Sequence, residues 1–159
     1  MKNSSSTSVV SWKGWRNMNN PVNIGEFKYR RISVVKREAL LQELKRILEK
    51  LDDVLFAYIY GSFIEREFFR DVDVAVWINN SEEAFRHEVE LSSKLEAELG
   101  IPIDIHVFNE APLPFKYVVF TKGRLLFSKD EEVRWRIIDK TVRQYADLRM
   151  LRSQIAKYG

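Results

Sequence analysis

The sequence contains no cysteine and only two histidines among its 159 residues. The absence of cysteine excludes disulfide bonds, zinc–thiolate sites and thiol catalysis. Proteins of the reducing cytoplasm commonly lack disulfides, and we expect this protein to be cytoplasmic. Because His87 and His106 are the only imidazoles, the composition also argues against a His-rich metal site. Any metal site must therefore depend on carboxylates.

Long hydrophobic runs are absent as well. No stretch approaches the roughly 18 consecutive apolar residues that a membrane-spanning helix requires. The Ser-rich N-terminus has no apolar segment of the kind found in a secretory signal. We therefore expect no membrane association. At 159 residues with 45% hydrophobic content, the chain has room for one domain with a real core.

Positive charge is concentrated near the N-terminus. Residues 1–37 contain eight Lys and Arg against Glu26 alone, and because the whole chain carries +3, the remainder is mildly acidic. Residues 1–31 show no sustained periodicity, so we expect them to be a basic, disordered extension and residues 32–159 to be the folded domain. The charge of this extension suits either a solvated tail or weak contact with nucleic acid. Met18 lies within it, which leaves a later translation start open.

Hydrophobic periodicity predicts alternating helices and strands from Ser33 onward. The predicted helices cover residues 34–51, 81–99, 115–121 and 130 to near the end, with one further helical turn inside 61–70. The predicted strands cover residues 55–60, 71–78, 101–108 and 124–128. This alternation is typical of an α/β or α+β architecture with a small sheet flanked by helices. The last helix is longer than such a sheet needs, which favours a surface for a partner.

The segment YGSFIEREFFRDVDVAV, residues 60–76, carries the polar residues that suggest chemistry. Gly61 and Ser62 follow a buried strand, where a glycine permits close approach of a phosphate and the turn exposes backbone N–H groups. Only eight residues separate Ser62 from Asp71, too few for a crossover connection. We therefore expect antiparallel strands that bring Gly61-Ser62 beside Asp71.

Three aspartates lie on the polar faces of the predicted strands. Asp71 and Asp73 share one face because side chains at i and i+2 of a strand point the same way. Asp104 lies on the polar face of the next strand, together with His106. For His106 we expect a structural role with a neighbouring partner, and a role beside the metals is the alternative. Oxygen ligands suit Mg²⁺ or Mn²⁺. Each aspartate alone fits an exposed strand position at least as well as a metal site. The combination of the three beside a phosphate-binding turn indicates two-metal phosphoryl or nucleotidyl transfer.

Two arginines lie in the connection that precedes these aspartates. Arg66 and Arg70 can neutralise charge on a departing pyrophosphate, and they are equally compatible with solvent-exposed loop positions.

The order of these elements resembles the nucleotidyltransferase superfamily that includes DNA polymerase beta and kanamycin nucleotidyltransferase. The size is similar to that of its smallest members, the minimal nucleotidyltransferases. The C-terminal stretch RLLFSKDEEVRWRIIDKTVRQYADLRMLRSQIAKYG looks like that of nucleotidyltransferase antitoxins paired with HEPN-domain toxins. The likeness runs from about Ser33 to the end, and it implies the nucleotidyltransferase fold, with a small mixed sheet and a long C-terminal helix.

The resemblance also implies roles for individual residues. Gly61 and Ser62 would hold the triphosphate of ATP, and Asp71 and Asp73 would ligate two Mg²⁺ ions. Asp104 would complete one metal site and help to activate the incoming hydroxyl. The implied reaction is the transfer of AMP from ATP to a tyrosine of a HEPN-domain RNase toxin, which neutralises the toxin.

Two departures from the family pattern support an alternative. The connection between Ser62 and Asp71 is shorter than is usual in that family, and Arg70 stands where a small hydroxyl residue often precedes the first aspartate. These departures fit a catalytically weak or inactive module that neutralises its partner by complex formation. A third class, an enzyme acting on a small hydroxyl compound such as an aminoglycoside, would normally need a second domain. Nucleotide preference, acceptor and oligomeric state are left open by the sequence.

Overall fold

A four-stranded mixed sheet forms the centre of the protein. The computed structural model describes residues 22–24 and 27–158. The sheet has the order β5-β4-β3-β6, in which β3 pairs antiparallel with both β4 and β6, and β4 pairs parallel with β5. The strands are β3 (Val54–Tyr60), β4 (Val72–Ile78), β5 (Ile103–Val107) and β6 (Arg124–Ser128). The predicted strands and the predicted antiparallel β3–β4 pair are confirmed.

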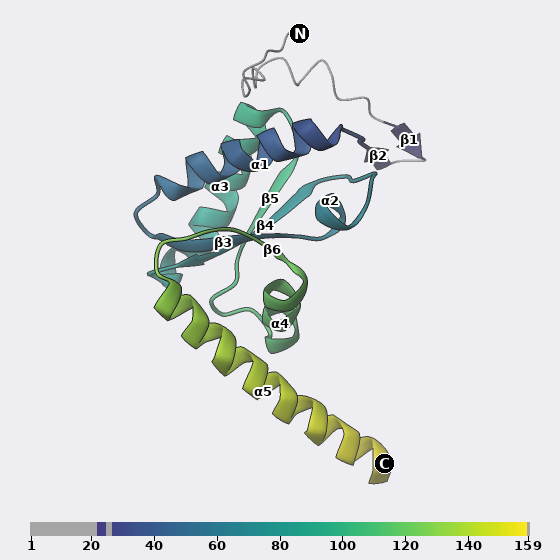
Figure 1. The fold of residues 1–159 in the computed structure, drawn as a ribbon, viewed down its shortest axis with the longest axis vertical. Coiled ribbons are helices and arrows are strands. Elements are labelled where there is room, and N and C mark those ends of the chain that lie inside the picture. The colour runs from purple at the N-terminus through teal and green to yellow at the C-terminus, as the bar shows by residue number, and fades with distance from the viewer. Residues whose placement is uncertain (1–21, 25–26, 159) are drawn as a thin grey trace.

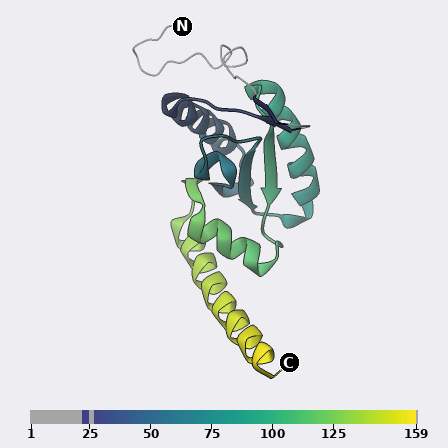
Figure 2. The same ribbon diagram turned by 90° about the vertical axis from the view of Figure 1, so that its right-hand side faces the viewer.

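Helices cover both faces of this sheet (Figures 1 and 2). On one face, α1 (Val34–Glu49) and α3 (Ala84–Leu99) bury leucines against the valines of β4. On the other face, α4 (Leu113–Lys122) and the first turns of α5 (Glu131–Tyr158) cover a smaller, largely aromatic core. That second core contains Phe56, Tyr58, Phe108 and Val119. The expected architecture of a small sheet flanked by helices is therefore confirmed.

Local signals explain where the helices begin and end. The Ser33 side chain caps α1 by accepting a hydrogen bond from the backbone N–H of Lys36 at 3.3 Å. Asn80 caps the 3₁₀ turn η2 (Ser81–Glu83), which leads into α3. Gly100 ends α3 in the left-handed conformation, with φ of 72°. The predicted boundaries of both helices thus follow from capping chemistry.

The long helix α5 is anchored at its N-terminal half and projects from the domain at its C-terminal half (Figure 1). Buried Arg134 donates hydrogen bonds to the Tyr58 hydroxyl and to Glu131, and Tyr145 stacks on Tyr117 of α4 at 4.0 Å between ring centroids. Beyond Tyr145 the helix has few contacts with the domain and its side chains are mostly exposed. Within the described part of the chain, no helix combines the length and the apolar character needed to cross a membrane.

Two short strands lie where the sequence predicted a structureless extension. β1 (Val22–Ile24) pairs antiparallel with β2 (Phe27–Tyr29), and Arg30 exchanges backbone hydrogen bonds with Phe69 at 2.7 and 3.0 Å. The prediction is wrong for these residues. Strands of three residues are too short for alternation to be visible, and backbone pairing does not require it. The rest of the predicted extension, with Met18, lies outside the described residues, and the domain boundary at residue 32 stays a prediction.

Candidate active site

The connection between β3 and β4 begins with a glycine in a conformation that other residues rarely adopt. Gly61 has φ of 80°, and its carbonyl accepts hydrogen bonds from the N–H groups of Ile64 and Glu65, both at 3.2 Å. These bonds form the single helical turn α2 (Ser62–Glu65), which confirms the predicted turn. Positive φ is favourable for glycine because it has no Cβ. Gly61 therefore allows the chain to leave β3 and turn at once along the edge of the site.

Gly61 also leaves room for a carboxylate. The antiparallel register pairs Tyr60 with Asp73, and a Cβ on Gly61 would lie 2.5 Å from Oδ2 of Asp73. Gly61 is thus adjacent to Asp73, two residues along β4 from the Asp71 beside which the sequence predicts Gly61-Ser62. The register decides this, because Asp71 precedes the first residue of β4 and extends beyond the end of β3.

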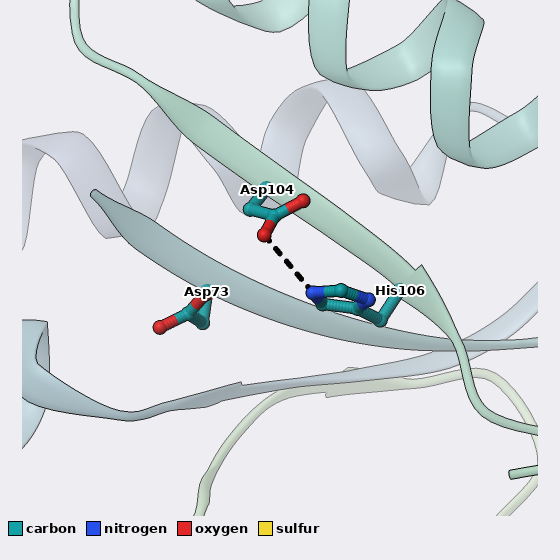
Figure 3. A group of neighbouring side chains, drawn as sticks. All are labelled: Asp73, Asp104 and His106. Carbon is teal, nitrogen blue, oxygen red and sulfur yellow. Dashed lines mark hydrogen bonds and ion pairs between the residues drawn. The ribbon is translucent and has the colours of Figure 1, made fainter.

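The parallel pairing of β4 and β5 brings the predicted carboxylates together. Asp73 lies opposite Asp104, and Ala75 lies opposite His106. One ligand atom from each of Asp73, Asp104 and His106 lies within 4.8 Å of the other two. Figure 3 shows these three side chains on the two adjoining strands, with the Nε2 atom of His106 3.0 Å from Oδ2 of Asp104. We call Asp73, Asp104 and His106 the triad.

Asp71 lies next to the triad without belonging to it. Its Oδ2 atom forms an ion pair with Nε of Arg70 at 3.3 Å. Its charge nevertheless acts on Asp73, since Asp71 is one of the groups that raise the pKa of the Asp73 carboxyl. Arg70, which the sequence placed either at a leaving pyrophosphate or in solvent, is therefore beside the carboxylates.

The electrostatics of the cluster favour a bound cation. Burial, followed by repulsion from Asp71 and Asp104, raises the pKa of Asp73 from 3.8 to about 6. Burial, followed by the negative charges of Asp73, Asp104 and Asp71, also raises the pKa of the neighbouring Tyr60 hydroxyl. Among the described residues, the Asp73 carboxylate has no hydrogen bond or ion pair. A divalent ion would relieve this repulsion, so the donor set fits the metal that the sequence implies.

A residue that the sequence analysis did not single out holds the β3–β4 connection in place. The guanidinium of Arg37, on α1, donates hydrogen bonds to the backbone carbonyls of Phe63, Arg66 (3.0 Å) and Glu67 (2.6 Å). It also lies over the rings of Phe63 and Phe69, 4.8 and 5.1 Å from their centroids. Arg37 therefore links α1 to the turn beside the carboxylates.

Sequence reasoning undervalued Arg37 and His106 for different reasons. Arg37 appeared only as part of the basic N-terminal region, and nothing in its sequence context indicates carbonyl partners about 30 residues away. The sequence predicts His106 on the face of Asp104 and favours a neighbouring partner over a role beside the metals. The structure confirms the face, but the neighbour is Asp104 itself, which puts the imidazole in the site. The Asp-x-His spacing was the available signal.

Comparison with known proteins places this geometry in a family. Residues 42–132, more than half of the chain, match the family described as "Polymerase beta, Nucleotidyltransferase". The sequence has no match among curated proteins at a significant level.

Several solved structures share the fold. A minimal nucleotidyltransferase (MNT) antitoxin in complex with a tri-AMPylated HEPN toxin from Shewanella oneidensis aligns with a TM-score of 0.62 and 20% identity, over 76% of this chain and 96% of that chain. A MntA–HepT toxin–antitoxin structure aligns with a TM-score of 0.60 and 20% identity, over 76% and 96% of the two chains. A toxin–antitoxin structure with AMP-PNP aligns with a TM-score of 0.60 and 23% identity, over 76% and 95%. At this level of identity the alignments establish the fold alone.

The family match runs from the middle of α1 to the start of α5, and it includes the β3–β4 connection and every carboxylate of the site. We conclude that the chain belongs to the polymerase beta nucleotidyltransferase family.

Proposed function

We propose that this protein is a metal-dependent nucleotidyltransferase that acts as an antitoxin. In this proposal it transfers AMP from ATP to a tyrosine of a HEPN-domain RNase toxin in the cytoplasm and thereby neutralises the toxin. The observation that carries the enzymatic part is the strand register, which pairs Asp73 with Asp104 while Gly61 abuts Asp73. The partner is suggested by the fold shared with antitoxins that were solved together with HEPN toxins.

Each residue of the site has its own role in the proposed reaction. Asp71, Asp73 and Asp104 would hold two Mg²⁺ or Mn²⁺ ions, and Gly61 and Ser62 would border the triphosphate. When bound, such ions neutralise phosphate charge and polarise the reacting oxygens. Asp104 is half-exposed at the edge strand β5, where an incoming hydroxyl can approach. We propose that Asp104 orients that hydroxyl.

The bonds that change in the proposed reaction are few. The acceptor oxygen forms a bond to the α-phosphorus of ATP, and the bond from that phosphorus to the bridging oxygen breaks. Pyrophosphate leaves, and the proton of the hydroxyl passes to a carboxylate of the site or to water. Positioning and charge neutralisation supply most of the catalysis in such transfers.

The exposed apolar residues in the C-terminal half of α5 support the proposal of a protein partner. Beyond Thr141 and Tyr145, which pack on the domain, the helix carries Leu151, Ile155 and Tyr158, whose spacing of three and four residues places them on one face. These three are 54%, 62% and 89% exposed. An apolar stripe that continues beyond its own domain is typical of a helix that packs against another protein. We propose that it contacts the toxin.

Transfer of label from α-labelled ATP to a co-purified HEPN-domain protein tests the proposal. The wild type should label the HEPN protein in the presence of Mg²⁺ or Mn²⁺, and chelation with EDTA should abolish labelling. Asp73→Asn should reduce the rate by at least about a hundredfold, since it removes a proposed metal ligand. Asp139→Asn, which removes an exposed carboxylate on α5, should leave the rate unchanged. If labelling persists in Asp73→Asn, or never occurs in the wild type, the enzymatic proposal fails.

One observation favours a second candidate, a module that neutralises its partner by binding alone. The Arg70–Asp71 ion pair places a cationic side chain against a carboxylate that would otherwise face a metal. If this pair disables the site, Arg70→Ser should create or increase transfer activity, whereas the complex with the HEPN protein should form equally well with either sequence. Binding unaffected by Asp73→Asn, together with no detectable transfer by Arg70→Ser, would favour the binding module.

A further inference from the structure

The imidazole of His106 lies where it can change which metal the site selects. The side chains of Asp104 and His106 point to the same face of β5, and Asp73 comes from the adjoining strand (Figure 3). The triad therefore offers one nitrogen and two carboxylate ligands rather than oxygen alone. Carboxylates suit Mg²⁺ and Mn²⁺, whereas imidazole shifts preference towards first-row transition ions.

The distances within the triad are close to those of ligands that share one ion. Ligand atoms bound at about 2.1 Å and at right angles lie about 3 Å apart. The Nε2 atom of His106 and Oδ2 of Asp104 are 3.0 Å apart, and the whole set lies within 4.8 Å. A cation between the imidazole and the Asp104 carboxylate would therefore meet both at ordinary ligand distances, and a carboxylate oxygen of Asp73 lies within 4.8 Å of both ligand atoms.

The surroundings of His106 hold its ring towards the carboxylates. The rings of Tyr60 and Phe115 each lie 6.2 Å from the imidazole, between centroids. The residue opposite His106 on β4 is Ala75, whose small side chain leaves the space above the strand to the imidazole. Because the side chain is 41% exposed, hydrated ions can reach it.

We propose that His106 is a metal ligand together with Asp73 and Asp104, and that this position prefers a later first-row transition ion such as Co²⁺ or Ni²⁺ to Mg²⁺. The proposal rests on the proposed metal-dependent function and adds to it the identity of the ion. It makes His106 a determinant of metal selectivity, whereas the carboxylates alone provide binding.

Metal binding to the full chain, without nucleotide or partner, tests this assignment. Calorimetry and the visible absorption of Co²⁺ report affinity and coordination directly. We expect Co²⁺ to bind at least about tenfold more tightly than Mg²⁺, and His106→Asn to lose most of that advantage while its Mg²⁺ affinity changes little. His87→Asn is the matched control, because the second histidine of the chain contacts Asp53 and not the site.

The paramagnetic shifts of the imidazole resonances identify the ligand independently. With only two histidines, Co²⁺ should shift the signals of His106 and leave those of His87 in place. Equal Co²⁺ affinity in wild type and His106→Asn, or shifts confined to His87, would overturn the proposal. Co²⁺ binding through His106 without any transfer to a HEPN protein would refute the enzymatic function and leave this inference standing. Transfer with Mg²⁺, together with no effect of His106→Asn on Co²⁺ binding, would refute this inference and leave the enzymatic function standing.

Discussion

Removal of the Asp73 charge should make the metal-free protein more stable at neutral pH. The carboxyl of Asp73 has a pKa of about 6 in the folded protein, against 3.8 for an ordinary aspartate. The folded state therefore holds this proton more tightly than the unfolded state. As the pH rises from about 4 to about 6, the unfolded chain loses the proton first, and the free energy of unfolding decreases. Above pH 6 this decrease in the free energy of unfolding is complete. Asp73→Asn should abolish the decrease, because the variant has no carboxyl at this position.

The size of the effect follows from the shift. A change of about two pKa units corresponds to about 3 kcal/mol when it is fully coupled to folding. Because Asp73 is only half-buried and solvent screens its neighbours, we expect about 1 to 2 kcal/mol. The free energy of unfolding of Asp73→Asn should thus exceed that of the wild type by this amount at pH 7.5 in EDTA. At pH 4 the two proteins should be equally stable. A saturating divalent ion at pH 7.5 should stabilise the wild type and have little effect on the variant.

Urea unfolding followed by circular dichroism from pH 4 to 8 provides the measurement. Asp139→Asn controls for the loss of one negative charge on a remote, exposed helix, and it should keep the wild-type pH dependence. Parallel pH profiles for wild type and Asp73→Asn in EDTA would refute the reasoning. So would a variant that is less stable than the wild type at pH 7.5, because that result would mean that the ionised carboxylate has a stabilising partner.

Three further predictions concern the connection and the core. Gly61→Ala should destabilise the protein by about 2 kcal/mol in thermal unfolding and abolish metal binding, because φ is 80° and the new Cβ would lie 2.5 Å from Oδ2 of Asp73; an unchanged melting temperature would contradict this. Arg37→Met should cost about 2 kcal/mol in urea unfolding, since three backbone carbonyls lose their donor, whereas Lys36→Met on the same turn of α1 should cost little. Leu95→Ala should cost about 3 kcal/mol by leaving a cavity under α3, and a loss below 1 kcal/mol would argue against the packing described.

Much of the fold is predictable from local pattern. The strict alternation in residues 71–78 predicts a strand with valines on one face, and β4 places Val72, Val74 and Val76 in the larger core. The short connection after Ser62 predicts the antiparallel β3–β4 pair. Gly100 predicts the end of α3. Each of these signals lies within a few residues of its effect. The β1–β2 pair and the Arg30–Phe69 bridge are not predictable in this way, because they depend on backbone groups.

The candidate site was predictable as a set of residue types, but its internal geometry was not. The aspartates and Gly61-Ser62 can be identified from spacing. Which carboxylate lies against Gly61 depends on the register of two strands, and a displacement of two residues exchanges Asp71 for Asp73. The inclusion of His106 likewise depends on the parallel pairing of β4 with β5.

The sequence by itself determined the elements, their amphipathic faces and the concentration of carboxylates on the polar faces of two strands. Those properties follow from periodicity and from the conformational preferences of single residues, which act locally. Only the tertiary structure decided that Asp73 converges with Asp104 and His106, and that Arg37 holds the turn. These contacts join residues on different elements, and strand register and packing, which arise from the whole sheet, set their distances.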